Sequence, residues 1–286
     1  MARPTFKAVW DFSNALAKVS TKARDAFLKA VEEIDFSDPE KAVEQLKRIG
    51  RVILDKYGLA SRELGAQWYD YCRQLAIDSG YTAGVGDVSR YGIDSDIDAL
   101  AVKLANGEIS ENDFVERLGG VMTTQIHNEA RNVILENLAE EHLKATEEGN
   151  DELAGKIGYC RVPVADACAF CVLLASRSFY PWQLYTSSKT AGEGRKYHAD
   201  CRCVVMPFFK ATQIDGYQKQ LDTYNDQYRT ADNKRRAGIQ DEELSARIAK
   251  AKAEHKAKFE RGEVTEPWRS INEDLIIMRW DNPGMK

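Results

Sequence analysis

Apolar side chains recur at intervals of three or four residues through much of the first half of the chain, separated by charged and polar positions. In the first such stretch the recurring residues are Phe6, Val9, Leu16, Val19, Ala23, Phe27, Val31 and Ile34. Apart from one wider gap, this spacing is typical of a helix that buries one face. The pattern therefore predicts a first helix over residues 6–34.

Two further helices are predicted in the same pattern. Ser37 or Asp38 can cap the second helix, and Gly58 is predicted to end it. The third is predicted over residues 61–80. Cys72 lies there among aromatic residues, and we expect it to be a buried core thiol, because lone cysteines behave as small hydrophobic side chains.

A glycine-rich stretch over residues 81–96 predicts a loop, from which a short helix restarts at Asp94 or Ser95. A longer helix is predicted over residues 110–148. Gly119 and the glycine that follows it are expected to break or kink that helix.

The pattern changes at Ile157. The segment IGYCRVPV is rich in β-formers and predicts a short edge strand, and CRCVVMPFF predicts a second strand. After Phe209 the chain is again predicted to be helical and highly charged. Its end is apolar around Trp268 and Trp280, so we expect this tail to dock on the body of the protein or on another protein.

These elements predict a mostly α-helical α+β protein with three regions. Residues 1–156 form a helical N-terminal region. Residues 157–210 form a small β unit that carries clustered Cys and His and is pinned by zinc. Residues 211–286 form a charged helical C-terminal arm with the docking tail.

The net charge and the hydropathy of the chain argue against some classes of protein. The formal net charge of −5 over 286 residues argues against a protein whose whole surface grips nucleic acid. No apolar run approaches the roughly 18–20 residues that cross a membrane. The N-terminal segment lacks the pattern of a signal peptide, so synthesis in the cytosol is predicted. In that reducing compartment, clustered cysteines favour metal binding or redox chemistry over disulfides.

Four of the six cysteines gather with one histidine in the pattern C-x2-C…H-x2-C-x-C. The residues are Cys168, Cys171, His198, Cys201 and Cys203. Structural zinc takes four thiolate or imidazole ligands in a tetrahedron, so the pattern predicts one structural zinc ion per chain, held by four of these five. Cys160 is a weaker sixth candidate.

Other interpretations of the cluster stay open. The cysteines could be buried and reduced with His198 at the surface. Cys168 and Cys171 could form a redox pair, although such pairs usually open a helix in a βαβ context that this sequence lacks. A catalytic thiol paired with His198 would need a third, orienting group, and no residue is singled out for that role.

The loop between the predicted strands is also a candidate partner contact. Its arginine and aromatic side chains are Arg177, Phe179, Tyr180, Trp182 and Arg195. Arginine and aromatic residues are enriched at interface hot spots, and the alternative is solvated charge around a zinc knuckle.

A basic run extends from Lys234 to Arg261. The default interpretation is a solvated helix, and binding to nucleic-acid phosphates is the alternative. No aromatic residue is interleaved from Arg235 to Lys258, which argues against base stacking.

The segments RVPVADACAFCVLLASRS and AGEGRKYHADCRCVVMPFF resemble the minor head proteins of tailed phages related to phage Mu protein F, in the version found in actinobacterial phages. The preceding NEARNVILENL is also similar, so the resemblance covers residues 120–210. A small departure is RSFY, where relatives often have a glycine after the arginine. The family pattern maps onto the same five Cys and His residues.

The resemblance implies a non-enzymatic role in head assembly or in DNA packaging or ejection. It implies a place in the virion, inside the head near the portal vertex, after synthesis in the host bacterial cytoplasm. The implied partners are the portal protein, major capsid and scaffold proteins, and packaged double-stranded DNA, without a membrane. The absence of G-x-S-x-G, H-E-x-x-H and Walker motifs fits an unfused structural form. The alternatives are a Cys/His-dependent enzyme or toxin domain, and a zinc-containing nucleic-acid-binding module.

Overall fold

The computed structural model describes residues 4–77, 81–89, 91–164, 169, 203–209, 218–262, 264 and 267–283. The chain divides into two compact units. The N-terminal unit comprises residues 1–164 and 182–216, and the C-terminal unit comprises residues 165–181 and 217–286. Each is described by itself.

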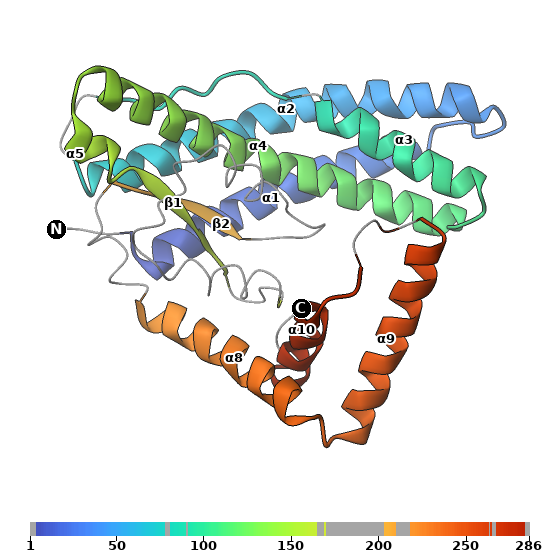
Figure 1. Ribbon diagram of the computed structural model, residues 1–286. Coiled ribbons are helices and arrows are strands. Elements are labelled where there is room, and N and C mark those ends of the chain that lie inside the picture. The colour runs from blue at the N-terminus through green and yellow to red at the C-terminus, as the bar shows by residue number, and fades with distance from the viewer. Residues whose placement is uncertain are drawn as a thin grey trace. The chain divides into compact units, whose positions relative to one another are not determined.

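The N-terminal unit is mostly helical, as the sequence predicts (Figure 1). Its elements are α1 (Phe6–Val31), α2 (Pro39–Gln74), α3 (Tyr91–Ala105), α4 (Glu111–Glu147), α5 (Asp151–Ala154), β1 (Gly158–Val162) and β2 (Val204–Phe208). Helices α1, α2 and α4 pack on one another, and α3 packs on α2 and α4. No helix among the described residues is both long enough and apolar enough to span a membrane.

The long helices begin at polar side chains that accept hydrogen bonds from first-turn amides. Asp38 caps α2 ahead of Pro39, and Ser110 caps α4 in a reciprocal pair with Asp113. These caps satisfy backbone donors that a helix start leaves unpaired. Of the two predicted caps of the second helix, Ser37 and Asp38, the structure therefore selects Asp38.

Helix α2 runs without interruption through Gly58, so the predicted end at this glycine is wrong. A Cβ atom there would lie 3.0 Å from Val88 Cγ1 and 3.4 Å from Glu129 Cγ. The missing side chain thus makes room for the loop after α2 and for α4. Glycine in a helix costs about 0.5–1 kcal/mol relative to alanine, and tertiary packing offsets that cost here.

Helix α4 likewise continues through Gly119, where a break or kink was predicted. A Cβ atom at Gly119 would lie 2.7 Å from Arg24 Nε and 3.2 Å from Leu28 Cδ1. Both neighbours belong to α1. The glycine is therefore a point of close approach between α1 and α4.

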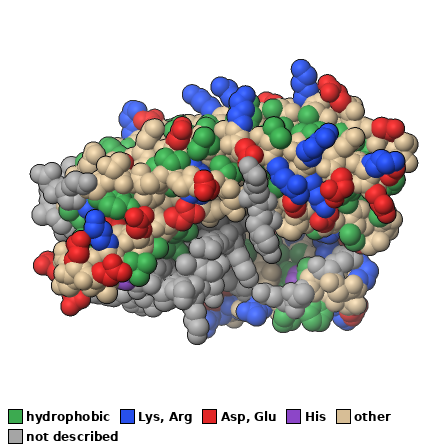
Figure 2. Space-filling model, turned by 90° about the horizontal axis from the view of Figure 1, so that it is seen from above, with side chains coloured by type: hydrophobic (Ala, Val, Ile, Leu, Met, Phe, Trp, Pro, Cys, Tyr) green, Lys and Arg blue, Asp and Glu red, His purple; other side chains and the backbone are tan. Residues whose placement is uncertain are grey.

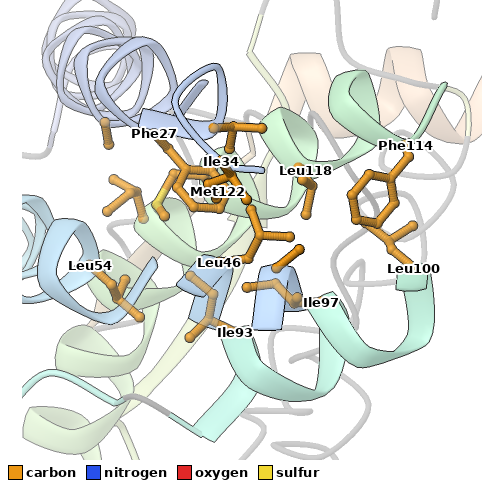
Figure 3. Close-up of a cluster of buried hydrophobic side chains, with 14 residues drawn as sticks. Phe27, Ile34, Leu46, Leu54, Ile93, Ile97, Leu100, Phe114, Leu118 and Met122 are labelled. Atoms are coloured by element: carbon orange, nitrogen blue, oxygen red, sulfur yellow. The ribbon is translucent and has the colours of Figure 1, made fainter. Parts of the chain in front are cut away.

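One buried cluster joins the four long helices of this unit (Figure 3). Its labelled members are Phe27, Ile34, Leu46, Leu54, Ile93, Ile97, Leu100, Phe114, Leu118 and Met122. Phe27 and Ile34 come from the periodic apolar positions of the first predicted helix, as expected for an amphipathic helix.

The described part of the predicted loop, residues 81–89, is tied down by buried polar side chains. Asn137 of α4 accepts from the Gly84 amide and donates to the Gly84 carbonyl, each at 2.8 Å. Its Oδ1 also accepts from the Tyr81 hydroxyl at 2.8 Å. Helix α3 then begins at Tyr91, earlier than the predicted Asp94 or Ser95.

Both predicted strands are present, and they pair antiparallel as a two-stranded sheet. The register places Gly158 opposite Phe208 and Val162 opposite Val204. Strand β2 is buried along its whole length and packs against α2 and α4.

The described part of the C-terminal unit contains α8 (Gln218–Ala237), α9 (Glu242–Glu260) and α10 (Ser270–Asp281). The buried members of its own apolar cluster are Ala169, Ala231, Leu244, Ile248, Ile277 and Met278. The apolar tail thus docks within the chain, because α10 packs on α8 and α9.

Candidate functional site

Strands β1 and β2 pair antiparallel with Val162 opposite Val204, so the chain leaves this sheet and re-enters it at the same end. All five predicted zinc ligands lie between these two residues in the sequence.

Cys203 is the one predicted ligand that the structure describes. It immediately precedes β2, its side chain is 3% exposed, and it forms no disulfide. Its backbone carbonyl accepts a hydrogen bond from Arg131 Nη2 of α4 at 3.3 Å. Cys203 is therefore held next to β2 by the helical body of the unit.

The other predicted site residues lie outside the described residues. These are the candidate ligands Cys168, Cys171, His198 and Cys201 and the candidate partner contacts Arg177, Phe179, Tyr180, Trp182 and Arg195. Within the described ranges, no group of three or more Cys, His, Asp or Glu side chains could hold a metal ion. The zinc site and its ligand set therefore remain predictions.

Strand β2 is anchored to α2 by a tryptophan. Trp68 Nε1 donates to the Val205 carbonyl at 3.0 Å. The indole is 4% exposed and stacks on Phe12 of α1, with ring centroids 4.9 Å apart. Just after the strand, Phe209 meets Tyr69 edge to face at 5.4 Å. The aromatic side chains thus fix the position of β2.

Two further cysteines lie in the core near the sheet. Cys72 of α2 is fully buried, as predicted, and Cys160 of β1 is 7% exposed. Burial raises the pKa of Cys160, and burial together with the neighbouring Cys160 raises that of Cys72. Burial therefore favours the protonated form of both thiols.

A buried ionic network joins α2 to α4, and no sequence pattern had indicated it. Arg62, 1% exposed, donates from Nη1 to Glu129 Oε2 at 3.1 Å and from Nη2 to Glu136. Its Nε donates to the Val85 carbonyl at 2.6 Å. Glu129 Oε1 accepts from the Ser89 amide at 3.2 Å. The network therefore ties segment 81–89 to both helices.

The surroundings of this network raise the pKa values of Glu129 and Arg62. Burial raises the pKa of Glu129, although hydrogen bonds from Arg62 and the Ser89 amide oppose the shift. Burial opposes the charge on Arg62, but hydrogen bonds to Glu136 and Glu129 outweigh it and raise its pKa. Buried charges are retained when they are paired in this way.

A second buried ion pair, between Arg73 and Glu141, joins the same two helices nearer their C-terminal ends. Arg73 Nε donates to Glu141 Oε1 at 2.8 Å, and the Tyr69 hydroxyl donates to Glu141 Oε2 at 2.5 Å. Burial, then Glu141, raise the pKa of Tyr69. Helical spacing places Arg62, Tyr69 and Arg73 on one face of α2, but it does not indicate their acidic partners in α4.

His127 of α4 is buried, with 4% of its surface exposed. Its Nε2 lies 3.0 Å from Ser20 Oγ, and the Ser20 hydroxyl donates to the Ala17 carbonyl at 3.0 Å. Because both side chains are buried inside the helical layer, this pair serves packing between α1 and α4.

A polar hollow of about 950 Å³ opens among α1, α3 and α4. Arg24 and Arg117 line it together with Asp96, Asp113 and Gln125. Asp96 accepts from Gln125 Nε2 at 2.7 Å, and Asp113 belongs to the cap of α4. Two of its acids, Asp96 and Asp113, are thus engaged in holding helices.

On the face shown in Figure 2, basic and acidic side chains of the described residues are interspersed. Among the described residues, the ion pairs Lys47–Asp98 and Arg51–Asp94 join α2 to α3. That face is therefore not a basic surface of the kind that wraps nucleic acid.

A family model described as "VG15 protein" matches residues 3–231. No curated protein matches the chain. No solved structure matches it.

Proposed function

Because the chain belongs to the VG15 protein family, a family of viral gene products, we propose that it is a structural head protein of a tailed phage. The family match is the observation that carries this proposal. It includes residues 120–210, where the sequence resembles the Mu F-like minor head proteins. The proposed role is that of a minor capsid protein that associates with the portal and the inner capsid and assists head assembly or DNA packaging and ejection.

The proposed role is structural rather than catalytic. The paired strands and their anchors support it, because they fix both flanks of the Cys/His segment on a packed helical body. We propose that zinc, held by four of the five Cys and His candidates, makes that segment a rigid clip. Structural zinc contributes on the order of 10 kcal/mol of binding free energy to small units of this kind.

This segment is also the proposed contact with the portal or another head protein. It contains arginine and large aromatic side chains, such as Arg177 and Trp182. Side chains of these two kinds contribute much of the binding energy at many protein interfaces. The location that follows is the interior of the phage head, near the portal vertex.

Co-expression with the portal protein of the same phage tests the proposal. We expect the portal protein to copurify with the full chain and to be absent from preparations of the double variant Arg177→Ala with Trp182→Ala. The matched control is Leu143→Ala, because Leu143 is an apolar side chain of α4 that is 61% exposed. That variant should still copurify with the portal protein.

Mass spectrometry of purified virions provides the second measurement. The proposal predicts peptides of this chain in the mature particle. Absence from the particle, together with failure to bind the portal protein, would contradict a head role. A Cys/His-dependent enzyme or toxin would then be the better hypothesis.

A further inference from the structure

The structure separates the basic run from Lys234 to Arg261 into groups with different partners. The three cations at the end of α8 are paired with carboxylates. Lys234 contacts Asp281 at 2.6 Å, Arg235 contacts Asp274 at 2.7 Å, and Arg236 contacts Asp232 at 2.8 Å. Lys234 and Arg235 hold α8 against α10. Arg236 pairs within α8 and stabilises the end of that helix.

The lysines on one side of α9 also have acidic partners. Lys252 lies 3.9 Å from Glu273 and Lys256 lies 3.7 Å from Glu260. By contrast, Arg247, Lys250 and Lys258 have no carboxylate within 4.0 Å in the described part of the chain, and all three are exposed. We call these three residues the basic stripe.

The basic stripe occupies one side of the helix. At 3.6 residues per turn, its three members fall within an arc of about 80° and span about 16 Å of helix axis. Leu244 and Ile248, the buried residues of α9, lie outside this arc. Two carboxylates share this side of the helix, Glu254 within the stripe and Glu243 one turn before Arg247. The three cations outnumber these carboxylates, so the stripe keeps a net positive charge.

We propose that the basic stripe of α9 binds the phosphate backbone of duplex DNA without regard to sequence. Protein interfaces draw most of their energy from large apolar or aromatic anchors. The exposed positions beside the stripe are instead small, namely Ala246 and Ala253. Phosphate binding requires only accessible cations. The absence of aromatic residues within the stripe means that bases are not stacked.

This inference assigns residues to a DNA contact that the proposed head role does not specify, and it does not depend on that role. It is tested on the purified full chain in the absence of any other head protein. Portal binding and DNA binding can therefore fail separately.

The experiment measures fluorescence anisotropy of a labelled random duplex of about 20 base pairs over a series of salt concentrations. We expect binding at about 50 mM salt, with an affinity that falls steeply as salt increases. The variant Lys250→Ala with Lys258→Ala should weaken binding at least about tenfold and lower the salt slope by about two, one for each phosphate that is no longer neutralised.

The matched control is Lys252→Ala with Lys256→Ala, which removes the same charge from the other side of the same helix. It should retain most of the affinity and the slope. A second variant, Glu254→Gln, removes one carboxylate from the stripe and should tighten binding severalfold. Because this variant gains rather than loses affinity, its effect is not explained by misfolding.

Two results would overturn the proposal. One is the lack of any binding by the unaltered chain at low salt. The other is an equal loss of affinity in the two double-lysine variants, because net charge rather than the stripe would then explain binding.

Discussion

Gly65 illustrates how single residues set the helix packing of the N-terminal unit. A Cβ atom there would lie 2.5 Å from Val133 Cγ1 and 2.6 Å from the Ala130 carbonyl oxygen. The second of these neighbours is a backbone atom, which cannot rotate away. The absence of a side chain at Gly65 therefore determines how closely α2 approaches α4.

Gly65→Ala should lower the free energy of unfolding by about 1–3 kcal/mol, because overpacking costs more than the gain in helix propensity. Urea denaturation of the full chain measures this. Gly120→Ala is the matched control, since a Cβ there meets nothing within 4 Å. It should leave the stability unchanged or raise it by up to about 1 kcal/mol. Equal effects of the two substitutions would contradict the packing argument.

Arg62 illustrates a residue whose partners are far away in sequence. Arg62→Met leaves Glu129 buried without its cation, so it should cost about 3–5 kcal/mol at neutral pH. The pKa of Glu129 is already raised in the folded protein. The stability that this carboxyl contributes is therefore lost as the pH rises from the pKa of the unfolded state, about 4.3, through the pKa of the folded state. Removing Arg62 raises that pKa further.

The cost of Arg62→Met should therefore be larger at pH 7 than at pH 5. Urea midpoints at the two pH values measure the difference. In the double variant with Glu129→Gln the extra pH dependence should largely disappear, because no buried carboxyl remains to be ionised. A cost of Arg62→Met that is the same at both pH values would argue against this account.

At the scale of elements, local pattern predicted the helices and the two strands well. The local pattern predicted helix ends wrongly where a glycine packs closely against a segment that is distant in the chain. Gly58 and Gly119 resemble helix ends in sequence, yet each packs closely against another segment inside a continuous helix. The start of α3 was predicted late, because no local signal distinguishes Tyr91 from the glycine-rich segment before it.

The β1–β2 pair is the element on which the candidate site depends. Trp68→Phe removes the hydrogen bond to the Val205 carbonyl while keeping an aromatic ring, so it should cost about 1–2 kcal/mol. Hydrogen exchange by mass spectrometry should show faster exchange in β1 and β2, with α3 unchanged. Unchanged exchange in both strands would show that Trp68 does not anchor the sheet.

At the scale of the whole molecule, the mostly helical fold with one small sheet was predictable, because amphipathic periodicity and β-formers are local properties. The buried Arg–Glu pairs were not, because Arg62 and Glu129 are 67 residues apart in sequence. The candidate zinc site stays a prediction from a cluster of residue types. Its ligand set stays open, because spacing allows five side chains to compete for four places.

Metal content of the purified full chain tests the zinc clip most directly. Elemental mass spectrometry should find about one zinc per chain. Cys171→Ser should lose the zinc and unfold at a lower temperature, whereas Cys160→Ala, which removes a buried protonated thiol, should keep it. A chain purified without chelators that contains no zinc, and whose Cys168 and Cys171 react freely with an alkylating reagent, would contradict the clip.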